Sequence, residues 1–348
     1  MVTSLHGVPT VKPFRALRYD TAVAGPLDDL VAPPYDVISD EQRLDYLARS
    51  PYNVVHLTLP DSDEQAAGDF MSWRDSGVLA AAEEVYWWVA QDYVGPDGVA
   101  RTREGVAASV PVSPYEERQI LPHERTHAGP KEGRLRLLRA TQTQLEPIFL
   151  LYDADPVFVR PGGDAAVDVE EGGVRTRMWP FAAGEVTIDT PLLIADGHHR
   201  YETAIAYREE RPEATHTFAI LVSSRAPGLE IFPTHRIVQS LGDVPGDVVD
   251  GPGEGVTLYR DGRYLRVRSS DEFGPRVVES FSPEGVSYTA YAKEAIAAVD
   301  SGDAAAAFLL QPVTTDQVAK FAGAGEVMPQ KSTFFFPKLT SGLLFHPV

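Results

Sequence analysis

The stretch that decides the fold is Pro191-Leu192-Leu193-Ile194-Ala195-Asp196-Gly197-His198-His199-Arg200-Tyr201-Glu202-Thr203-Ala204-Ile205-Ala206-Tyr207. Its first four residues form an apolar run typical of a buried strand, and its end mixes apolar and polar residues as a helix does. Between them lie an acid, a glycine, two histidines and an arginine without a spacer. A strand that turns through glycine into a helix leaves free backbone N–H groups at the positive end of the helix dipole. The turn therefore predicts an anion site, at which Arg200 adds donors suited to phosphate.

A purely structural interpretation of this turn is also available. Asp196 would cap the helix, and the histidines would be surface residues. Nothing structural needs five consecutive ionisable or glycine residues at one turn, so the functional interpretation is preferred.

The length and composition of the chain limit the classes of protein to consider. Its 348 residues have room for two domains, or for one domain with a large insertion. The net charge of −19 argues against a nucleic-acid partner, because phosphate backbones need clustered Lys and Arg. Cysteine is absent, which excludes disulfides and thiolate metal sites. Residues 1–14 lack a signal-peptide pattern and no apolar run approaches bilayer length, so we expect a soluble cytoplasmic protein without a membrane partner.

Periodicity and turn residues predict a mixture of helices and strands, hence an α/β or α+β chain with mixed sheets. Hairpins are expected in residues 85–112, 156–190 and 256–268, and a loose linker in 242–255. The predicted helices are 39–49, 63–75, 130–142, 290–299 and 314–321, and the predicted single strands are 54–59, 146–152, 217–222 and 306–310.

Three further segments carry candidate chemistry. Residues 120–127 hold a second cluster of ionisable residues, centred on His123 and Glu124. Residues 328–338 place two lysines and two hydroxyls around an aromatic strand, which suits a phosphate or a carboxylate; a C-terminal strand with exposed lysines is the structural alternative. The Pro-Pro-Tyr-Asp segment at 33–36 is either a rigid surface loop or a wall of the site.

These segments together resemble one family of bacterial and archaeal proteins, known only as domain of unknown function 1015. The resemblance covers nearly the whole chain and brings no established activity. It is carried by residues 31–38, His123-Glu124 with Thr126, residues 146–149, 195–201, 233–236 and 328–333.

More distant resemblances imply a fold and a chemistry. Gly197-x-x-Arg200-x-x-x-Ala204 is similar to the phosphate-binding turn of the ParB proteins, and Gly197-x-His199-Arg200-Tyr201 to the signature of sulfiredoxin. His198 stands where sulfiredoxin has its catalytic cysteine, which excludes that chemistry. ParB-type DNA binding would need a helix-turn-helix and a basic face, and neither is evident.

The archaeal ADP-dependent free-serine kinases resemble this chain in three motifs that occur in the same order. Pro122-His123-Glu124 matches the motif with their catalytic glutamate, and residues 196–200 match the one with their catalytic aspartate. Lys331-Ser332-Thr333 loosely matches their C-terminal Pro-Lys-Thr-Thr, with Gln330 inserted. Two departures, the longer spacing between the first two motifs and the unmatched first hundred residues, leave the nucleotide and acceptor specificity open.

The resemblance implies transfer of a phosphoryl group from ADP or ATP to a small hydroxyl acceptor, with free L-serine as the leading candidate. Glu124 would take or orient the hydroxyl proton, and Asp196 would position the acceptor or a magnesium ion. A histidine-rich metal site is the less favoured alternative. The predicted site residues are, with catalytic roles, Glu124, Asp196, His198 and Arg200; for the cofactor, Gly197, His199, Lys331, Ser332 and Thr333; and for the substrate, His123, Thr126, His235, Arg236 and Lys338.

Two other functions use the same residues. A nucleotide-sensing regulatory or scaffold protein would bind at the turn without turnover, and a phosphoester hydrolase would use Glu124 to activate water. In each case we expect a ParB/sulfiredoxin-like core at 115–240, an N-terminal segment (1–114) packed on it, and a C-terminal α/β lobe (241–348) that contributes the Lys-Ser-Thr motif. The oligomeric state is left open.

Overall fold

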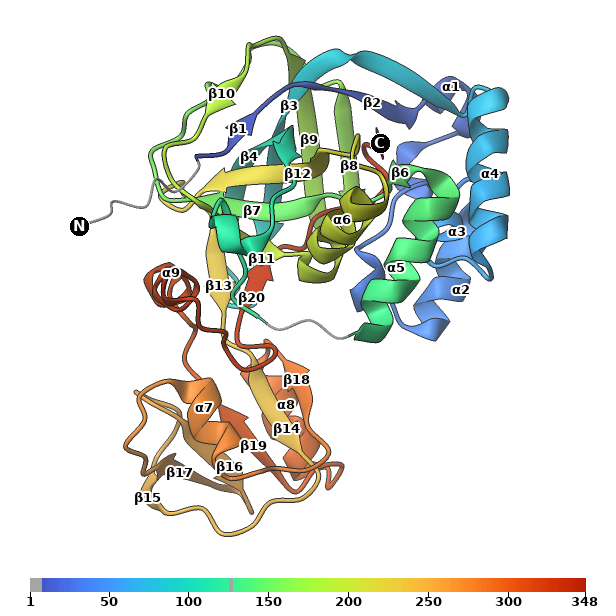
Figure 1. Cartoon of the computed structure of the whole chain (residues 1–348). Helices are drawn as coiled ribbons and strands as arrows, with labels where there is room; N and C mark the ends of the chain where they lie inside the picture. Colours follow the sequence, from blue (N-terminus) through green and yellow to red (C-terminus); the bar gives the residue numbers. More distant parts are fainter. Residues whose placement is uncertain (1–7, 125–127) are drawn as a thin grey trace, which may run out of the picture.

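The structure, a computed structural model, describes residues 8–124 and 128–348 (Figure 1). It combines helices with several sheets, which confirms the predicted mixed α/β class. Across these two ranges, no helix has the length and apolar character needed to span a bilayer.

A large mixed sheet forms the upper body in Figure 1, and within the described residues it contains nine strands. Their order is β5-β11-β7-β12-β4-β3-β9-β8, with β2 also paired to β3. The pairs β5/β11 and β7/β12 are parallel and the others antiparallel. The strands are β2 (Phe14–Tyr19), β3 (Leu79–Val94), β4 (Ala100–Pro111), β5 (Ile120–Leu121), β7 (Ile148–Tyr152), β8 (Val167–Glu171), β9 (Val174–Phe181), β11 (Leu192–Asp196) and β12 (His216–Ser223).

The helices of this body gather at one end of the sheet. In Figure 1, α5 (Ala128–Thr141) lies between α6 (His198–Glu210) and the N-terminal helices, and it packs on both α6 and α4. The N-terminal helices are α1 (Thr21–Ala24), α2 (Asp40–Arg49), α3 (Val55–Thr58) and α4 (Asp63–Asp75), with short 3-10 turns η1 (Leu27–Asp29), η2 (Tyr35–Val37) and, before β5, η3 (Tyr115–Glu117).

The C-terminal lobe, at the bottom of Figure 1, is built on a second, six-stranded sheet of order β15-β17-β16-β19-β14-β18. Val238, Leu258 and Phe308 are buried in its own core. The elements of this lobe are β14 (His235–Val238), β15 (Gly246–Val249), β16 (Thr257–Arg260), β17 (Arg263–Val267), α7 (Gly274–Glu279), β18 (Ser287–Thr289), α8 (Ala292–Asp300) and β19 (Ala306–Leu309).

The chain then returns from the lobe to the large sheet. After α9 (Thr315–Ala324), β20 (Phe334–Phe336) pairs with β13 (Glu230–Phe232), so that both crossings between the two parts lie side by side. The last residues join the N-terminal part through backbone pairing of Ser341 with Ala32 and of Phe345 with Leu17. Two short sheets complete the fold: β1 (Thr10–Val11) with β10 (Val186–Thr187), and β6 (Thr143–Gln144) with β21 (His346–Pro347).

Most predicted elements are confirmed, and one is wrong. Helices start after Ser39 and Thr314, each with a capping box. Residues 54–59, predicted as a strand, instead hold α3. The cause is Asn53, whose side-chain oxygen accepts the Val55 N–H at 3.0 Å and whose amide donates to two backbone carbonyls, so the carboxamide starts a helical turn that overrides the β-branched pattern.

The predicted domain limits stay a prediction. Residues 1–114 supply β2, β3 and β4, and residues 115–240 supply β7, β11 and β12, to the same sheet. Residues 242–255, predicted as a linker, include β15.

Candidate functional site

The site begins at the turn from β11 into α6. Asp196 ends the strand, Gly197 has a φ of +91°, and His198 begins the helix. The backbone at Gly197 favours glycine, and a Cβ atom there would lie 3.0 Å from Nε of Arg200 and press on its guanidinium. Among the described residues, no side chain caps α6, and Asp196 therefore does not act as the cap that the structural interpretation expected.

Asp196 instead lies between two cations. Its Oδ2 is 2.7 Å from Nη2 of Arg200, and its Oδ1 accepts a hydrogen bond from Nζ of Lys338. The side chains of Asp196 and Arg200 are only 13% and 10% exposed. Burial alone would raise the pKa of Asp196, but Lys338 and Arg200 hold this pKa well below its usual value. Asp196 thus serves two cations, and Arg200 also interacts electrostatically with the carboxylates of Glu146 and Asp36.

Two histidines connect the turn to the second motif. Nδ1 of His123 donates to the carbonyl oxygen of Ile194 at 2.7 Å, and the His123 backbone N–H donates to Nε2 of His198 at 3.3 Å. The two rings lie 4.7 Å apart, edge to face. Burial lowers the pKa of His123. Burial and the neighbouring His123 together lower the pKa of His198 well below its usual value. Both imidazoles are therefore neutral at pH 7.

The Lys331-Ser332-Thr333 motif contacts Glu124 through the hydroxyl of Thr333. Oγ1 of Thr333 lies 2.9 Å from Nε2 of His123 and 3.4 Å from Oε1 of Glu124. Glu124 pairs with Met328 as a parallel bridge, and the Met328 N–H donates to the carbonyl of His123 at 2.8 Å. This backbone pairing brings together residues more than 200 positions apart.

A guanidinium from the C-terminal lobe holds the turn that carries Lys331. Nη2 of Arg236 donates to the carbonyls of Gln330 and Lys331 at 3.4 and 3.2 Å. Lys331 has a φ of +53° and an exposed side chain. The neighbouring hydroxyl of Ser332 donates to the carbonyl of Pro329 at 2.5 Å. Lys331 thus reaches solvent, whereas Ser332 is buried.

The remaining predicted residues lie in different places. His199 follows His198 in the first turn of α6 and is partly exposed. His235 is buried in the C-terminal lobe, where its Nδ1 accepts the Leu310 N–H at 3.1 Å, and burial lowers its pKa to about 4. Thr126 lies outside the described residues.

The structure adds a buried arginine that sequence reasoning missed. Arg103 is 2% exposed, donates to Oε1 of Gln91, and places its guanidinium 4.5 Å from the ring centre of Phe149. Gln91 in turn donates to the carbonyl of Lys338 at 3.2 Å, so Arg103 supports the segment that carries this lysine. Burial lowers the pKa of Arg103 to about 10. No sequence signal marks it, because strand arginines are usually exposed.

Glu146 is the second residue whose role the sequence did not reveal. Its carboxylate is buried at the start of β7, where Oε1 accepts the Tyr35 N–H at 3.1 Å and the Ser341 hydroxyl at 2.8 Å. The same carboxylate interacts electrostatically with Arg200. Glu146 therefore fastens both the Pro-Pro-Tyr-Asp segment and the C-terminal segment beside the ion group.

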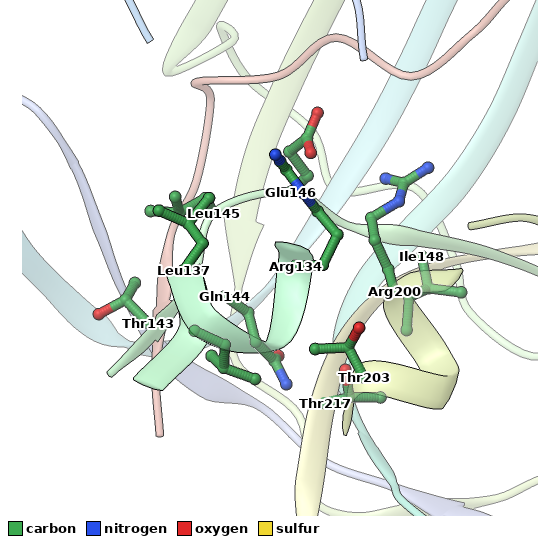
Figure 2. Close-up of a pocket in the computed structure, with 11 residues that line it drawn as sticks. Arg134, Leu137, Thr143, Gln144, Leu145, Glu146, Ile148, Arg200, Thr203 and Thr217 are labelled. Carbon is green, nitrogen blue, oxygen red and sulfur yellow. The ribbon is translucent and has the colours of Figure 1, made fainter. Parts of the chain in front are cut away.

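A narrow cavity adjoins Arg200 between α5, α6 and the start of β7. Figure 2 shows the charged ends of Arg134, Glu146 and Arg200 on one side of it, with leucine and threonine side chains around the rest. Its free volume is about 50 Å³. Ligand pockets usually measure roughly 300–1,000 Å³, so this cavity does not hold a nucleotide.

The side chains fit an anion better than a metal ion. Across the described residues, no group of three or more His, Asp and Glu side chains is placed to hold a metal. Both oxygens of Asp196 are engaged by cations, so magnesium at this carboxylate would have to displace Lys338. The positive end of the α6 dipole and the surrounding cations suit phosphate oxygens.

Comparisons with known proteins give a family and remote structural likenesses. The sequence matches the family described as "Protein of unknown function (DUF1015)" over residues 11–250. No curated protein matches the chain.

Solved structures similar to the chain include a free serine kinase in complex with AMP (14% identity, TM-score 0.40, 62% of this chain and 83% of that one). Another is SbnI with C-terminal truncation from Staphylococcus aureus (12% identity, TM-score 0.41, 67% and 84%). A third is a conserved hypothetical protein from Pyrococcus furiosus (14% identity, TM-score 0.37, 62% and 87%). At these scores the likenesses say nothing of what this chain does.

Proposed function

We propose that this chain, which belongs to the DUF1015 family of proteins of unknown function, transfers a phosphoryl group from a nucleotide to a small hydroxyl acceptor. ADP and ATP are the candidate donors, and free L-serine is the leading candidate acceptor.

One observation carries this proposal: a carboxylate, a hydroxyl and two cations held by Asp196 lie in one cluster. Glu124 is 18% exposed, so its carboxylate is accessible to a small molecule. His123 links it to the strand that ends in Asp196, since its ring bonds both Thr333 and the Ile194 carbonyl. A phosphotransferase needs these parts close together: a carboxylate for the acceptor's proton and cations for the phosphate charge.

Phosphate binding is assigned to the start of α6 and to the cations around it. The N–H groups of Gly197, His198 and His199 lie at the positive end of the helix dipole. Arg200 and Lys338 are fixed by Asp196, so they are pre-organised before a ligand arrives. Lys331, on the exposed turn next to Thr333, supplies a further charge for the moving phosphoryl group.

The chemical step transfers one phosphoryl group and one proton. The acceptor oxygen attacks the terminal phosphorus, its proton passes to the Glu124 carboxylate, and the bond from phosphorus to the bridging oxygen of the nucleotide breaks. The shortened nucleotide leaves with the electron pair of that bond. Asp196 takes no part in bond making, because it holds the two cations in place, and no metal is assigned to it.

The test uses Glu124→Gln, which keeps the shape of the side chain and removes its basicity. We expect the wild type, given ADP or ATP and L-serine, to form phosphoserine, measured by phosphorus NMR. The variant should lose at least about 100-fold in turnover, the usual contribution of a general base. Its affinity for the nucleotide, measured by calorimetry, should change little.

The outcomes separate this function from its alternatives. Nucleotide binding without any product, across a panel of hydroxyl acceptors, would favour a regulatory protein and contradict the proposal. Release of inorganic phosphate without an acceptor would favour a hydrolase. Equal loss of binding and turnover in Glu124→Gln would assign the carboxylate a role in folding.

A further inference from the structure

Thr333 has the surroundings of an activated nucleophile. Its hydroxyl has two acceptors, Nε2 of His123 at 2.9 Å and Oε1 of Glu124 at 3.4 Å. The carbonyl of Ile194 can only accept, so Nδ1 of His123 carries the ring proton and Nε2 has the free lone pair. The hydrogen bonds form a chain from the Thr333 hydroxyl to the His123 imidazole and on to the Ile194 carbonyl oxygen, which orients the ring. Enzymes that use a hydroxyl nucleophile have the same order of hydroxyl, imidazole base and orienting oxygen.

We propose that Thr333 is itself a phosphorylation site, which the protein modifies from its own bound nucleotide when no acceptor is present. This inference rests on the proposed function, because the donor is the nucleotide of the same site. The hydroxyl lies beside the carboxylate assigned to the acceptor's proton, so a phosphoryl group delivered to that acceptor comes within reach of Thr333.

The step balances in the same way as transfer to the acceptor. Oγ1 of Thr333 attacks the terminal phosphorus, and the hydroxyl proton passes to Nε2 of His123. The bond from phosphorus to the bridging oxygen of the nucleotide breaks, and the shortened nucleotide leaves. The lowered pKa of His123 keeps its imidazole neutral and ready to accept this proton at pH 7.

Other hydroxyls near the site lack this arrangement. Ser332 is 2% exposed, and its hydroxyl donates to the Pro329 carbonyl, away from the imidazole. In the C-terminal lobe, Thr289 lies opposite His235 in the β14/β18 pair, but its hydroxyl bonds Oε2 of Glu294 at 2.5 Å and the Tyr291 N–H, and among the described residues it has no hydrogen bond to an imidazole. Thr289 is therefore a matched control: a threonine hydroxyl on a glutamate without an imidazole base.

Phosphorylation of Thr333 would close the site to the acceptor. The phosphate would bring a charge of about −1.5 to −2 next to the Glu124 carboxylate and repel it. Arg236, whose charge interacts with that of Glu124, holds the backbone of the same turn and limits how far the modified residue can move away. The modified protein should therefore bind the acceptor less well.

The experiment incubates the full chain with ADP or ATP and no acceptor, and then measures intact mass and fragment masses. We expect one added phosphoryl group at Thr333. Thr333→Val should lose the added mass, Thr333→Ser should carry it on the new serine, and Thr289→Val should keep it at Thr333. Near-identical thermal unfolding of the variants would exclude a folding defect.

A parallel assay with L-serine separates this inference from the proposed function. Phosphoserine without modified Thr333 would overturn only the inference, and so would a phosphate mapped to any other residue. Modified Thr333 without any small-molecule product would support the inference and contradict the acceptor reaction. Neither signal would overturn both.

Discussion

At the scale of single residues, the charge balance around Asp196 is the main physical feature. A carboxylate buried with two cations is favourable only while all three are present, because each charge has lost most of its hydration. Nη1 of Arg200 also donates a hydrogen bond to the Pro147 carbonyl, and Nζ of Lys338 lies 5.7 Å from the ring centre of Phe334. Each of the two cations therefore has a second contact besides Asp196.

This balance gives a prediction for stability and pH. Asp196→Asn should lower the free energy of unfolding at pH 7 by about 3–5 kcal/mol, because both cations lose their counter-charge. The folded-state pKa of Asp196 is depressed, so its contribution is complete above its unfolded pKa of about 3.9 and is lost as pH falls toward the folded pKa. The difference between the two proteins should therefore shrink below about pH 4. Urea unfolding across pH measures it.

The matched control is the exposed ion pair of Asp247 and Arg268. Asp247→Asn should change the stability at pH 7 very little, because solvent screens both charges. A constant difference between wild type and Asp196→Asn from pH 7 to pH 3 would contradict the assignment.

At the scale of elements, the turn from β11 to α6 does two things at once. It starts α6 directly at the end of a buried strand, and it brings Arg200 back to Asp196. Both depend on the left-handed backbone of Gly197, which an L-residue adopts only with strain.

Gly197→Ala tests this element. We expect a loss of about 1–3 kcal/mol in the free energy of unfolding from backbone strain. We also expect weaker binding of ADP or ATP, because the added methyl would press on the Arg200 guanidinium. Denaturant unfolding and calorimetry measure the two effects.

Gly163→Ala provides the control for strain alone. Gly163 has a φ of +89°, and a Cβ there meets nothing within 4 Å. It should show a similar loss of stability with unchanged nucleotide affinity. Equal weakening of binding in both variants would mean that the contact with Arg200 is irrelevant.

At the scale of the whole molecule, the site depends on how the C-terminal segment crosses the fold. This segment delivers Thr333 to Glu124 and Lys338 to Asp196, and it ends against the N-terminal helices. There Phe345 is fully buried, with its ring centre 5.6 Å from that of Tyr19. The N-terminal helices therefore support the site without contributing a proposed catalytic residue.

Phe345→Ala should expose this long-range support. We expect a loss of about 3–5 kcal/mol in stability from the cavity. Because the loosened segment carries Lys338, nucleotide affinity should also fall. The equally buried Phe308, in the core of the C-terminal lobe, is the control: Phe308→Ala should cost similar stability while leaving affinity nearly unchanged. The same affinity in both variants would show that the segment does not transmit the effect.

Local sequence was a good guide to elements and to the chemistry of single motifs. The strand, glycine and helix at 192–210 could be predicted, as could the caps at Ser39 and Thr314, because these depend on neighbouring residues. The wrong strand at 54–59 marks the limit. There, long-range hydrogen bonds from Asn53 to the carbonyls of Asp29 and Val31 help hold the residue that starts a helix.

The sequence by itself determined the mixed α/β class, the sharp turn at Gly197 and the residue types of an anion site. Only the tertiary structure decided which charges meet. It gave Asp196 two cations, buried Arg103 and Glu146, and placed the Thr333 hydroxyl between His123 and Glu124. The physical reason is the separation along the chain of the residues that interact. Helix starts and turns are set by bonds within a few residues, whereas burial and ion pairing depend on segments more than 200 positions apart that are joined only when the C-terminal chain folds back across the sheet.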